Sequence, residues 1–406
     1  MRKTIITTAI ALLSLTALAG KPQKNTVATR PTIETVAPDA VGMDAASLGY
    51  ADAAIDRAIA ENNIPGAVLC VVRHGKIGYL KAYGNKRVYP TVEKMTTDAV
   101  FDLASCSKAM ATATCAMMLV ERGQLRLLDP VSAYVPGFGN WRDSTGNRKT
   151  IRVVNLMTHT SGLPPYAPVA ELSKKHGAPC ADGVMEYISN CRRDFAPGEG
   201  WQYSCLNYIT LGRIIEKISG KSLRQFAHDN LFAPLGMNHT DYTPTETLAT
   251  ECVPTEKQPD GKCLQGVVHD PLARIMMGGV SGNAGVFSSA TDIATYCAAI
   301  LNGGEWHGRR ILSPLAVKCM ETVPRGLERW GHTPGWDVLT PYSSNTGDLL
   351  SPNTIGHTGY TGTSIVIDPD NDMAIILLTN AVHPEDKGNT VRLRGQVANA
   401  VAGAVR

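Results

Sequence analysis

The stretch FDLASCSKAM, residues 101–110, places Ser105 three residues before Lys108 and leads directly into a segment that carries no charge. As a helix, that segment, residues 109–120 (AMATATCAMMLV), is apolar around its whole circumference, which is typical of a helix enclosed by a sizeable core. Gly123 then supplies a C-terminal stop. The sequence therefore predicts a buried helix with Ser105 at its N-terminal end.

The spacing of Ser105 and Lys108 has a chemical consequence. Residues three apart share one face of a helix, so the Lys108 amine can lie beside the Ser105 hydroxyl. The positive end of the helix dipole favours an oxyanion formed at the same place. This arrangement turns a hydroxyl into a nucleophile. A single S-x-x-K also arises by chance in a chain of 406 residues, so the alternative is a capping Ser beside a solvated Lys.

The composition is that of a folded globular protein, with 44% hydrophobic and 18% charged residues. Two basic residues precede an apolar run over residues 4–18 that ends in small side chains, which predicts a cleaved secretory signal over residues 1–19. Residues 20–40 are polar and predict an extended leader. No later run has the length of a membrane span. We therefore expect a periplasmic or secreted protein.

The net charge and the spacing of the Cys and His residues exclude several classes of ligand. A net charge of +3 gives no support for nucleic-acid binding, and the scattered His residues lack metal-ligand spacing, so no metal or cofactor is implied. The ten Cys contain no C-x-x-C. Cys180 and Cys191 flank one segment and Cys252 and Cys263 flank another, and either pair could be bridged because export permits disulfides.

Strand signals gather near the two ends of the chain. Two β-rich runs within residues 67–84 predict one hairpin, and two within residues 365–380 predict another. Between them, residues 101–270 are dominated by helical patterns. Helices are predicted over residues 45–62 with Asp44 as a cap, over 211–219 with Gly220 as a stop, from the capping Asp292 through Tyr296 to Leu301, and over 391–405.

This order of elements predicts an α+β fold in which both hairpins share one antiparallel sheet flanked by the terminal helices. Residues 41–100 and 271–406 would form this sheet subdomain, with residues 101–270 inserted as a mainly helical subdomain. An active site would fall between the two.

Four further stretches add to the first one: LMTHTSGLP (156–164), PGEGWQYSCLNY (197–208), GNAGVFSSATDI (282–293) and GHTGYTGTS (356–364). In this order and spacing they resemble the serine β-lactamase-related family, which contains class C β-lactamases, D-Ala-D-Ala carboxypeptidases, D-aminopeptidases and esterases. The likeness covers about residues 41–390. It implies a β-lactamase/transpeptidase-like fold and a serine hydrolase that works through an acyl-enzyme.

The resemblance also implies roles for single residues. Ser105 becomes the acylated nucleophile, and Lys108 and Tyr203 become the general-base pair that moves its proton. The oxyanion hole maps to the backbone N–H groups of Ser105 and Tyr360. The residues implied to bind substrate are Cys205, His357, Thr358 and Gly359.

Two departures from the family pattern bear on the substrate. Where the family commonly has Y-x-N, this chain ends the motif in Cys205, and a thiol is a poor substitute for an amide. Where β-lactamases have K-T-G, this chain begins with His357, which is only fractionally charged at neutral pH. A contact to His357 predicts a substrate affinity that falls as pH rises through the imidazole range. Both departures disfavour a β-lactam or D-Ala-D-Ala substrate.

The sequence therefore predicts an exported serine hydrolase that acts on a small ester or amide, of the esterase or D-amino-acid peptidase type. A β-lactamase or D-Ala-D-Ala carboxypeptidase is the first alternative. A catalytically weak protein that binds cell-wall fragments is the second, and it is disfavoured because Ser105, Lys108 and Tyr203 are all retained.

Overall fold

The computed structural model describes residues 33–338, 340, 343 and 345–406. The predicted signal peptide lies outside these residues, as does most of the predicted leader. The described end of the leader contacts the fold: Thr35 pairs with Ile77 and Pro38–Val41 forms a 3-10 helix, η1.

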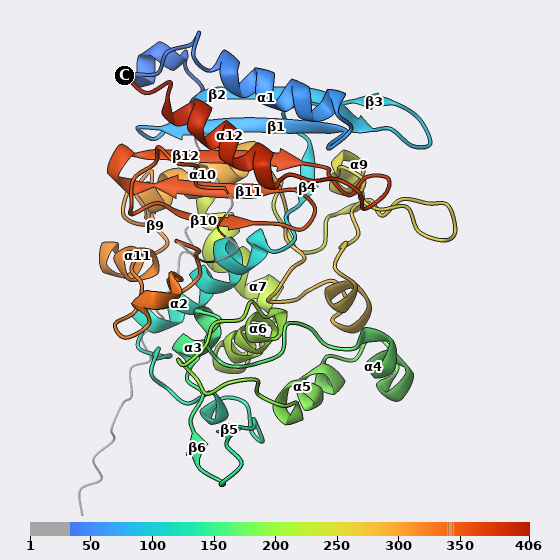
Figure 1. Cartoon of the computed structure of the whole chain (residues 1–406), viewed down its shortest axis with the longest axis vertical. Helices are drawn as coiled ribbons and strands as arrows, with labels where there is room; N and C mark the ends of the chain where they lie inside the picture. Colours follow the sequence, from blue (N-terminus) through green and yellow to red (C-terminus); the bar gives the residue numbers. More distant parts are fainter. Residues whose placement is uncertain (1–32, 339, 341–342, 344) are drawn as a thin grey trace, which may run out of the picture. The chain divides into compact units, whose positions relative to one another are not determined.

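A six-stranded sheet joins the two ends of the chain (Figure 1), as predicted. Each strand is antiparallel to its neighbours, and β1 pairs with both β12 and β2. The strands lie in the order β10 (Ile355–Thr358), β11 (Ser364–Asp368), β12 (Met373–Thr379), β1 (Gly66–Arg73), β2 (Lys76–Arg87) and β3 (Glu93–Lys94). The α+β prediction is confirmed.

The central strand β1 is buried on both faces, because its side chains alternate between two cores. Val68 and Cys70 belong to the large core that continues into the helical part of the chain. Leu69 and Val71 belong to a second core under two helices from opposite ends of the chain, α1 (Gly49–Ala60) and α12 (Val391–Ala402) (Figure 1). Helix α10 (Ala290–Leu301) covers the other face, and its side chains join the first core.

The middle of the chain is mainly helical, with short strands that the sequence prediction missed. Among these strands, β4 pairs with β7 and β5 with β6. The remaining elements are β4 (Val100–Asp102), η2 (Lys108–Ala113), α2 (Thr114–Glu121), η3 (Val131–Ala133), β5 (Trp141–Arg142), β6 (Arg148–Lys149), α3 (Val153–Met157), α4 (Val169–His176), α5 (Ala181–Asn190), α6 (Cys205–Ser219), α7 (Leu223–Ala227), η4 (His228–Phe232), α8 (Ala233–Leu235), α9 (Glu246–Glu251), η5 (Leu272–Met276), β7 (Phe287–Ser289), β8 (Glu305–Trp306), β9 (Arg309–Arg310), α11 (Pro314–Glu321), η6 (Glu328–Trp330) and η7 (Pro369–Asn371).

The helix that follows Ser105 is buried, as predicted. Its first part, η2, is a π-helical segment, and α2 continues it to Glu121. Every side chain from Cys106 to Leu119 is buried. Gly123 has a positive φ of 68°, which suits its predicted role as the stop. This segment holds Ser105 at the junction of the large core and the sheet.

The starts of three helices differ from the sequence prediction. The Asp44 carboxylate accepts from Ser47 N–H at 2.8 Å within a turn, and α1 begins only at Gly49. Helix α10 is capped by Ser289 rather than Asp292. Helix α6 begins six residues earlier than predicted, at Cys205. Helices α6 and α10 begin earlier because Ser204 and Ser289 accept free N–H groups of the first turn, whereas α1 begins later because Asp44 takes part in a turn instead.

All ten Cys are free, so neither proposed disulfide pair is bridged. Helix α5 lies between Cys180 and Cys191 and separates them by about 16 Å at 1.5 Å per residue, which is too far for a disulfide. Cys252 is buried at the end of α9, where its thiol donates to Leu248 O at 3.4 Å.

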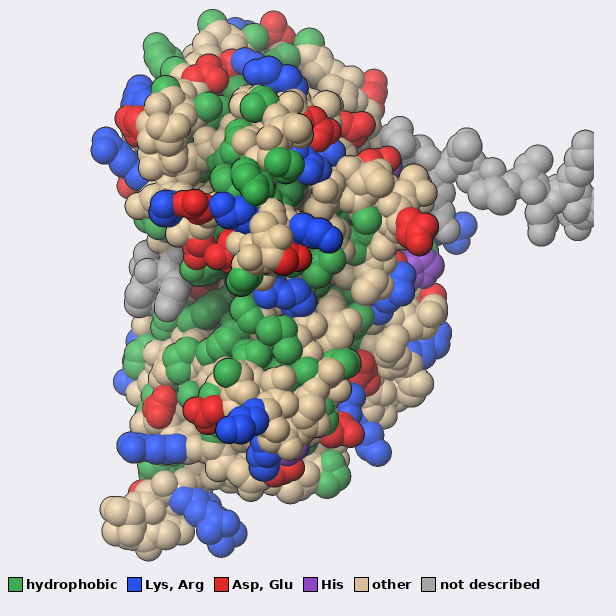
Figure 2. All heavy atoms as spheres, turned by 90° about the vertical axis from the view of Figure 1, so that its right-hand side faces the viewer, with side chains coloured by type: hydrophobic (Ala, Val, Ile, Leu, Met, Phe, Trp, Pro, Cys, Tyr) green, Lys and Arg blue, Asp and Glu red, His purple; other side chains and the backbone are tan. Residues whose placement is uncertain are grey.

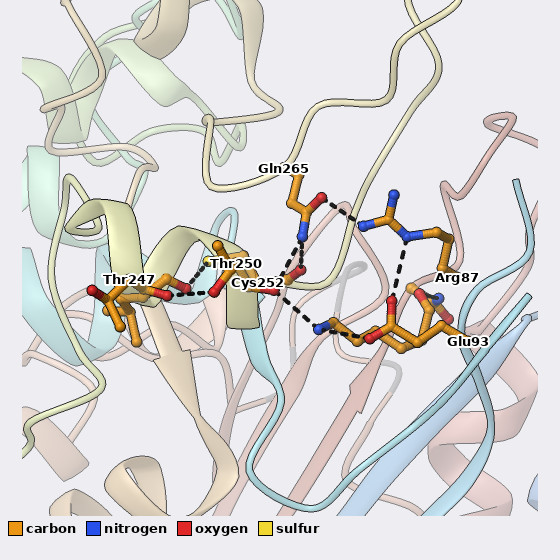
Figure 3. A network of polar contacts seen from close by, with 9 residues as sticks. Arg87, Glu93, Thr247, Thr250, Cys252 and Gln265 are labelled. Atoms are coloured by element: carbon orange, nitrogen blue, oxygen red, sulfur yellow. Dashed lines mark hydrogen bonds and ion pairs between the residues drawn. The ribbon is translucent and has the colours of Figure 1, made fainter. Parts of the chain in front are cut away.

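A polar network fastens α9 to the β2–β3 edge of the sheet (Figure 3). Arg87 Nη2 donates to Gln265 Oε1 at 2.7 Å, and Gln265 Nε2 donates to the carbonyls of Thr250 and Cys252. Arg87 also pairs with Glu93 at 3.5 Å. The network anchors the long loop between α9 and η5 to the sheet.

None of the helices in the described part of the chain has the length and apolarity needed to cross a membrane. On the face shown in Figure 2, hydrophobic side chains gather across the middle, and acidic and basic side chains are interspersed around them.

Candidate active site

Ser105 lies in a short turn that joins β4 to the buried helix. Residues 102–105 form this turn, which we call the nucleophile turn. Ala104 has a φ of 45°, a left-handed conformation that is strained for a residue with a side chain. The Asp102 carboxylate, 2% exposed, accepts the Ala104 N–H at 2.9 Å and so helps to hold this conformation. The turn leaves Ser105 half-buried, at the start of the helix.

Lys108 contacts the Ser105 hydroxyl, as the S-x-x-K spacing predicts. Its Nζ donates to Ser105 Oγ at 2.9 Å and to Asn283 O at 2.8 Å. The side chain is fully buried, and within the described residues none of its hydrogen bonds goes to a carboxylate. The amine is thus held by neutral oxygen atoms beside the candidate nucleophile.

Tyr203, the second residue before α6, is the third member of this cluster. The Lys108 Nζ lies 5.0 Å from the centre of the Tyr203 ring. Burial raises the pKa of Tyr203 well above its usual value, while its hydrogen bond with Ser105 acts in the opposite direction. The phenol therefore keeps its proton at neutral pH. The structure brings Ser105, Lys108 and Tyr203 together.

The second candidate oxyanion donor lies in the turn after β10, residues 358–363, which we call the third-motif turn. Gly359 passes close to the nucleophile turn: a Cβ there would lie 2.4 Å from Leu103 O. Among the described residues, neither the Ser105 N–H nor the Tyr360 N–H has a hydrogen-bond acceptor. The Tyr360 side chain points away into solvent, 66% exposed, and donates to Asp386 at 2.6 Å.

Cys205 takes the place of the amide in the family's Y-x-N motif. The thiol is half-buried, and burial raises its pKa, while hydrogen bonding to Lys108 and Asn283 lowers it. Asn207, two residues later, serves another purpose, because its side chain bonds to Ser161 Oγ at 2.5 Å. Asn283, whose importance sequence reasoning missed, contributes the carbonyl that accepts from Lys108.

His357 is not a partial cation at neutral pH, so that expectation was wrong. The side chain is 1% exposed, and burial lowers its pKa to about 4. Its Nδ1 donates to Thr358 O at 2.9 Å, and its ring lies 6.2 Å from that of Tyr203. Any effect of His357 charge on substrate affinity therefore belongs near pH 4, below the imidazole range.

Two more buried histidines stand behind Tyr203, and sequence reasoning assigned them no role. The rings of His159 and Tyr203 lie 4.6 Å apart, and those of His159 and His332 lie 5.1 Å apart. His332 Nε2 is 3.7 Å from the Asp337 carboxylate. His159 was detectable, because it belongs to the LMTHTSGLP stretch. No group of His, Cys, Asp or Glu among the described residues is arranged to hold a metal ion.

This histidine group is expected to make the fold sensitive to acid. Burial is the largest of the effects that lower the pKa values of His159, His332 and His357 below 6.5. The unfolded chain binds these protons at a higher pH than the folded chain, so the free energy of unfolding falls as pH drops below about 6.5, and for His357 the loss extends to about pH 4. We expect His357 alone to contribute up to about 3 kcal/mol of this loss.

Urea unfolding measured at several pH values between 7 and 4 tests this expectation. His357→Gln removes one titrating imidazole and is expected to flatten the dependence of the unfolding free energy on pH, whatever it does to stability at pH 7. An unchanged slope in His357→Gln would contradict the assignment.

The chain belongs to the β-lactamase family, whose sequence profile matches residues 51–399. Over 94% of this chain and 92% of theirs, it is 32% identical to proteins of Salmonella typhimurium and Salmonella newport, each named a putative D-alanyl-D-alanine carboxypeptidase. The protein is thus a serine hydrolase of this family, whose members typically use a Ser-Lys-Tyr mechanism.

Solved structures confirm the β-lactamase/transpeptidase-like fold. One is EstCE1, described as a hydrolase with promiscuous acyltransferase activity, with a TM-score of 0.70, 24% identity, and coverage of 88% of this chain and 99% of that one. Another is a class C β-lactamase, with a TM-score of 0.69, 22% identity, and coverage of 89% and 97%. At this level of identity the likeness concerns the fold alone.

Proposed function

We propose that the protein is an exported serine hydrolase that cleaves a small ester or amide through an acyl-enzyme on Ser105. The observation that carries this proposal is the contact of the buried Lys108 amine with the Ser105 hydroxyl at 2.9 Å, with Tyr203 beside both. The apolar N-terminal run supports export.

In the acylation step, Ser105 Oγ attacks the carbonyl carbon and its proton passes to the neutral form of the Lys108 amine. Because Tyr203 retains its proton, it is suited to act as the acid that protonates the leaving group, after which Lys108 returns the proton to the phenol. The Ser105 and Tyr360 N–H groups stabilise the oxyanion of the tetrahedral intermediate.

In the deacylation step, a water molecule attacks the acyl-enzyme carbonyl and gives a proton to the same Lys108–Tyr203 pair. Collapse of the second tetrahedral intermediate breaks the bond to Ser105 Oγ, which recovers its proton, and the carboxylic acid leaves. We expect the substrate to lie against Thr358 and Gly359, at the end of β10 and beside Ser105.

The two departures from the family pattern favour an uncharged group next to the scissile bond. Cys205 and His357 occupy the positions at which the family commonly has an amide and a lysine. Because burial holds the pKa of His357 at about 4, no fixed cation stands there to bind a substrate carboxylate at neutral pH. This supports an ester, or an amide of a D-amino acid whose carboxylate is absent or placed elsewhere.

A D-Ala-D-Ala carboxypeptidase is the second candidate, and the names of the relatives at 32% identity favour it. In that case another cation must bind the substrate carboxylate, or the carboxylate must stay in solvent.

Substrate comparison tests the choice between the candidates. We expect kcat/KM for a 4-nitrophenyl ester to exceed that for a chromogenic cephalosporin or an acyl-D-Ala-D-Ala peptide by about 100-fold or more. His357→Lys is the matched variant: it should shift the ratio toward the carboxylate substrates by about tenfold, the worth of one charged hydrogen bond. Rapid release of D-Ala by the unaltered protein would favour the second candidate, and rapid cephalosporin turnover a β-lactamase.

A further inference from the structure

Buried threonine hydroxyls join the two turns that carry the proposed oxyanion donors. Thr361 Oγ1 donates to Asp102 O at 2.8 Å, and Thr363 Oγ1 donates to Leu103 O at 3.0 Å. Both threonines are at most 2% exposed. The acceptors belong to the nucleophile turn and the donors to the third-motif turn. The two bonds therefore set how far apart the turns lie.

The Thr363 hydroxyl is closely surrounded by the backbone of Gly359, by Leu103 O and by Cys106 Sγ, which lies 3.7 Å away. A Cβ on Gly359 would lie 2.1 Å from Thr363 Oγ1 and 2.4 Å from Leu103 O, so the backbone at residue 359 approaches both atoms closely. Leu103 O also accepts from Cys106 N–H at 3.0 Å. Removing the Thr363 hydroxyl would thus take away the bond between the turns without leaving this buried carbonyl unpaired.

Other bonds hold the third-motif turn from the opposite side. Arg394 Nη2, from α12, donates to Gly359 O at 2.9 Å. Thr379 Oγ1, at the end of β12, donates to Gly362 O at 3.1 Å. Neither bond reaches the nucleophile turn. Thr379 and Thr363 therefore offer a matched pair. Both hydroxyls are buried and help to hold the third-motif turn, but of the two only Thr363 bonds to the nucleophile turn.

We propose that Thr363, assisted by Thr361, is a positioning residue of the oxyanion hole that fixes the separation of the Ser105 and Tyr360 N–H groups. The inference rests on the proposed acyl-enzyme function. The hydroxyl touches no reacting atom and acts through the backbone. Oxyanion donors act only within a narrow range of distance from the developing charge, and a misplacement of about 1 Å costs about 100-fold in rate.

Thr363→Val tests this role because it keeps the shape of the side chain and removes the donor. We expect kcat for an activated ester, and the rate at which a fluorophosphonate labels Ser105, to fall by about 10- to 100-fold, with KM within about twofold of the unaltered protein. Thr363→Ser, which keeps the hydroxyl, should restore both rates to within about threefold. A merely structural role would not give this separation of kcat from KM together with rescue by Ser.

Thr379→Val is the control for losing a buried hydroxyl at the same turn. We expect its melting temperature to fall about as far as that of Thr363→Val, while kcat stays within about threefold of the unaltered value. Should Thr363→Val fail to fold, Thr361→Val serves in its place with the same expected separation of kcat from KM. Equal kcat losses in the Thr379 and Thr363 variants would overturn the proposal.

The rate of fluorophosphonate labelling distinguishes a failure of this inference from a failure of the proposed function. If Ser105 is labelled in the unaltered protein and at the same rate in Thr363→Val, the positioning role is overturned and the acyl-enzyme function stands. If Ser105 is not labelled even in the unaltered protein, both are overturned.

Discussion

Ser105→Ala is expected to lower kcat for any ester substrate by about 10⁴-fold or more, because the acyl-enzyme can no longer form. The remaining rate would come from binding and from the oxyanion donors alone. Since Ser105 is half-buried in a turn held by other residues, the melting temperature should change little. Initial rates with a 4-nitrophenyl ester, measured to the limit set by the uncatalysed reaction, provide the test.

Ser107→Ala is the matched control. The Ser107 hydroxyl is buried two residues away and accepts the Val286 N–H at 3.1 Å, so its loss should lower stability by about 1–3 kcal/mol. Turnover should nevertheless persist. If Ser105→Ala keeps more than a small fraction of the activity, or if Ser107→Ala loses as much, the assignment of the nucleophile is wrong.

Lys108→Met is expected to produce the second large loss, about 10²- to 10⁴-fold in kcat, because the proton of the Ser105 hydroxyl then has no nearby base. Met fills much of the same volume and suits a fully buried position, so the fold should be retained. The value of kcat/KM measures the loss of catalysis, and the melting temperature measures any loss of stability.

Lys108→Arg distinguishes a base from a fixed positive charge. Arg keeps the charge but does not give up its proton in proteins. A general base predicts that Lys108→Arg is as inactive as Lys108→Met, whereas an electrostatic role predicts that Arg retains much of the activity. The second result, in a variant that folds, would contradict the mechanism proposed for Lys108.

The two hairpins and the candidate nucleophile could be predicted from the sequence because short-range patterns encode them. Alternating and continuous apolar runs marked the hairpins of β1–β2 and β11–β12, and the S-x-x-K spacing placed Lys108 beside Ser105. The order of the elements, with strands at both ends of the chain and helices between them, then predicted the pairing of the hairpins in one sheet. The division into two subdomains and the predicted roles of the site residues remain proposals.

Other features depend on contacts between segments that are distant in the sequence. The charge of His357 was misjudged because its pKa is set by burial against Tyr203 and the neighbouring histidines, which no local pattern reports. Asn283 acts through its backbone carbonyl, and side-chain chemistry cannot reveal such a role. The predicted possibility of a Cys180–Cys191 disulfide was wrong, because the intervening residues form a helix, α5, that holds the two thiols apart.

Covalent labelling of Ser105 tests the central claim most directly. The intact mass of the purified protein is measured after exposure to a fluorophosphonate, beside Ser105→Ala treated in the same way. We expect one adduct per chain in the unaltered protein and none in the variant, with peptide mapping placing the adduct on Ser105. An unlabelled protein, or an adduct that persists in Ser105→Ala, would contradict the account.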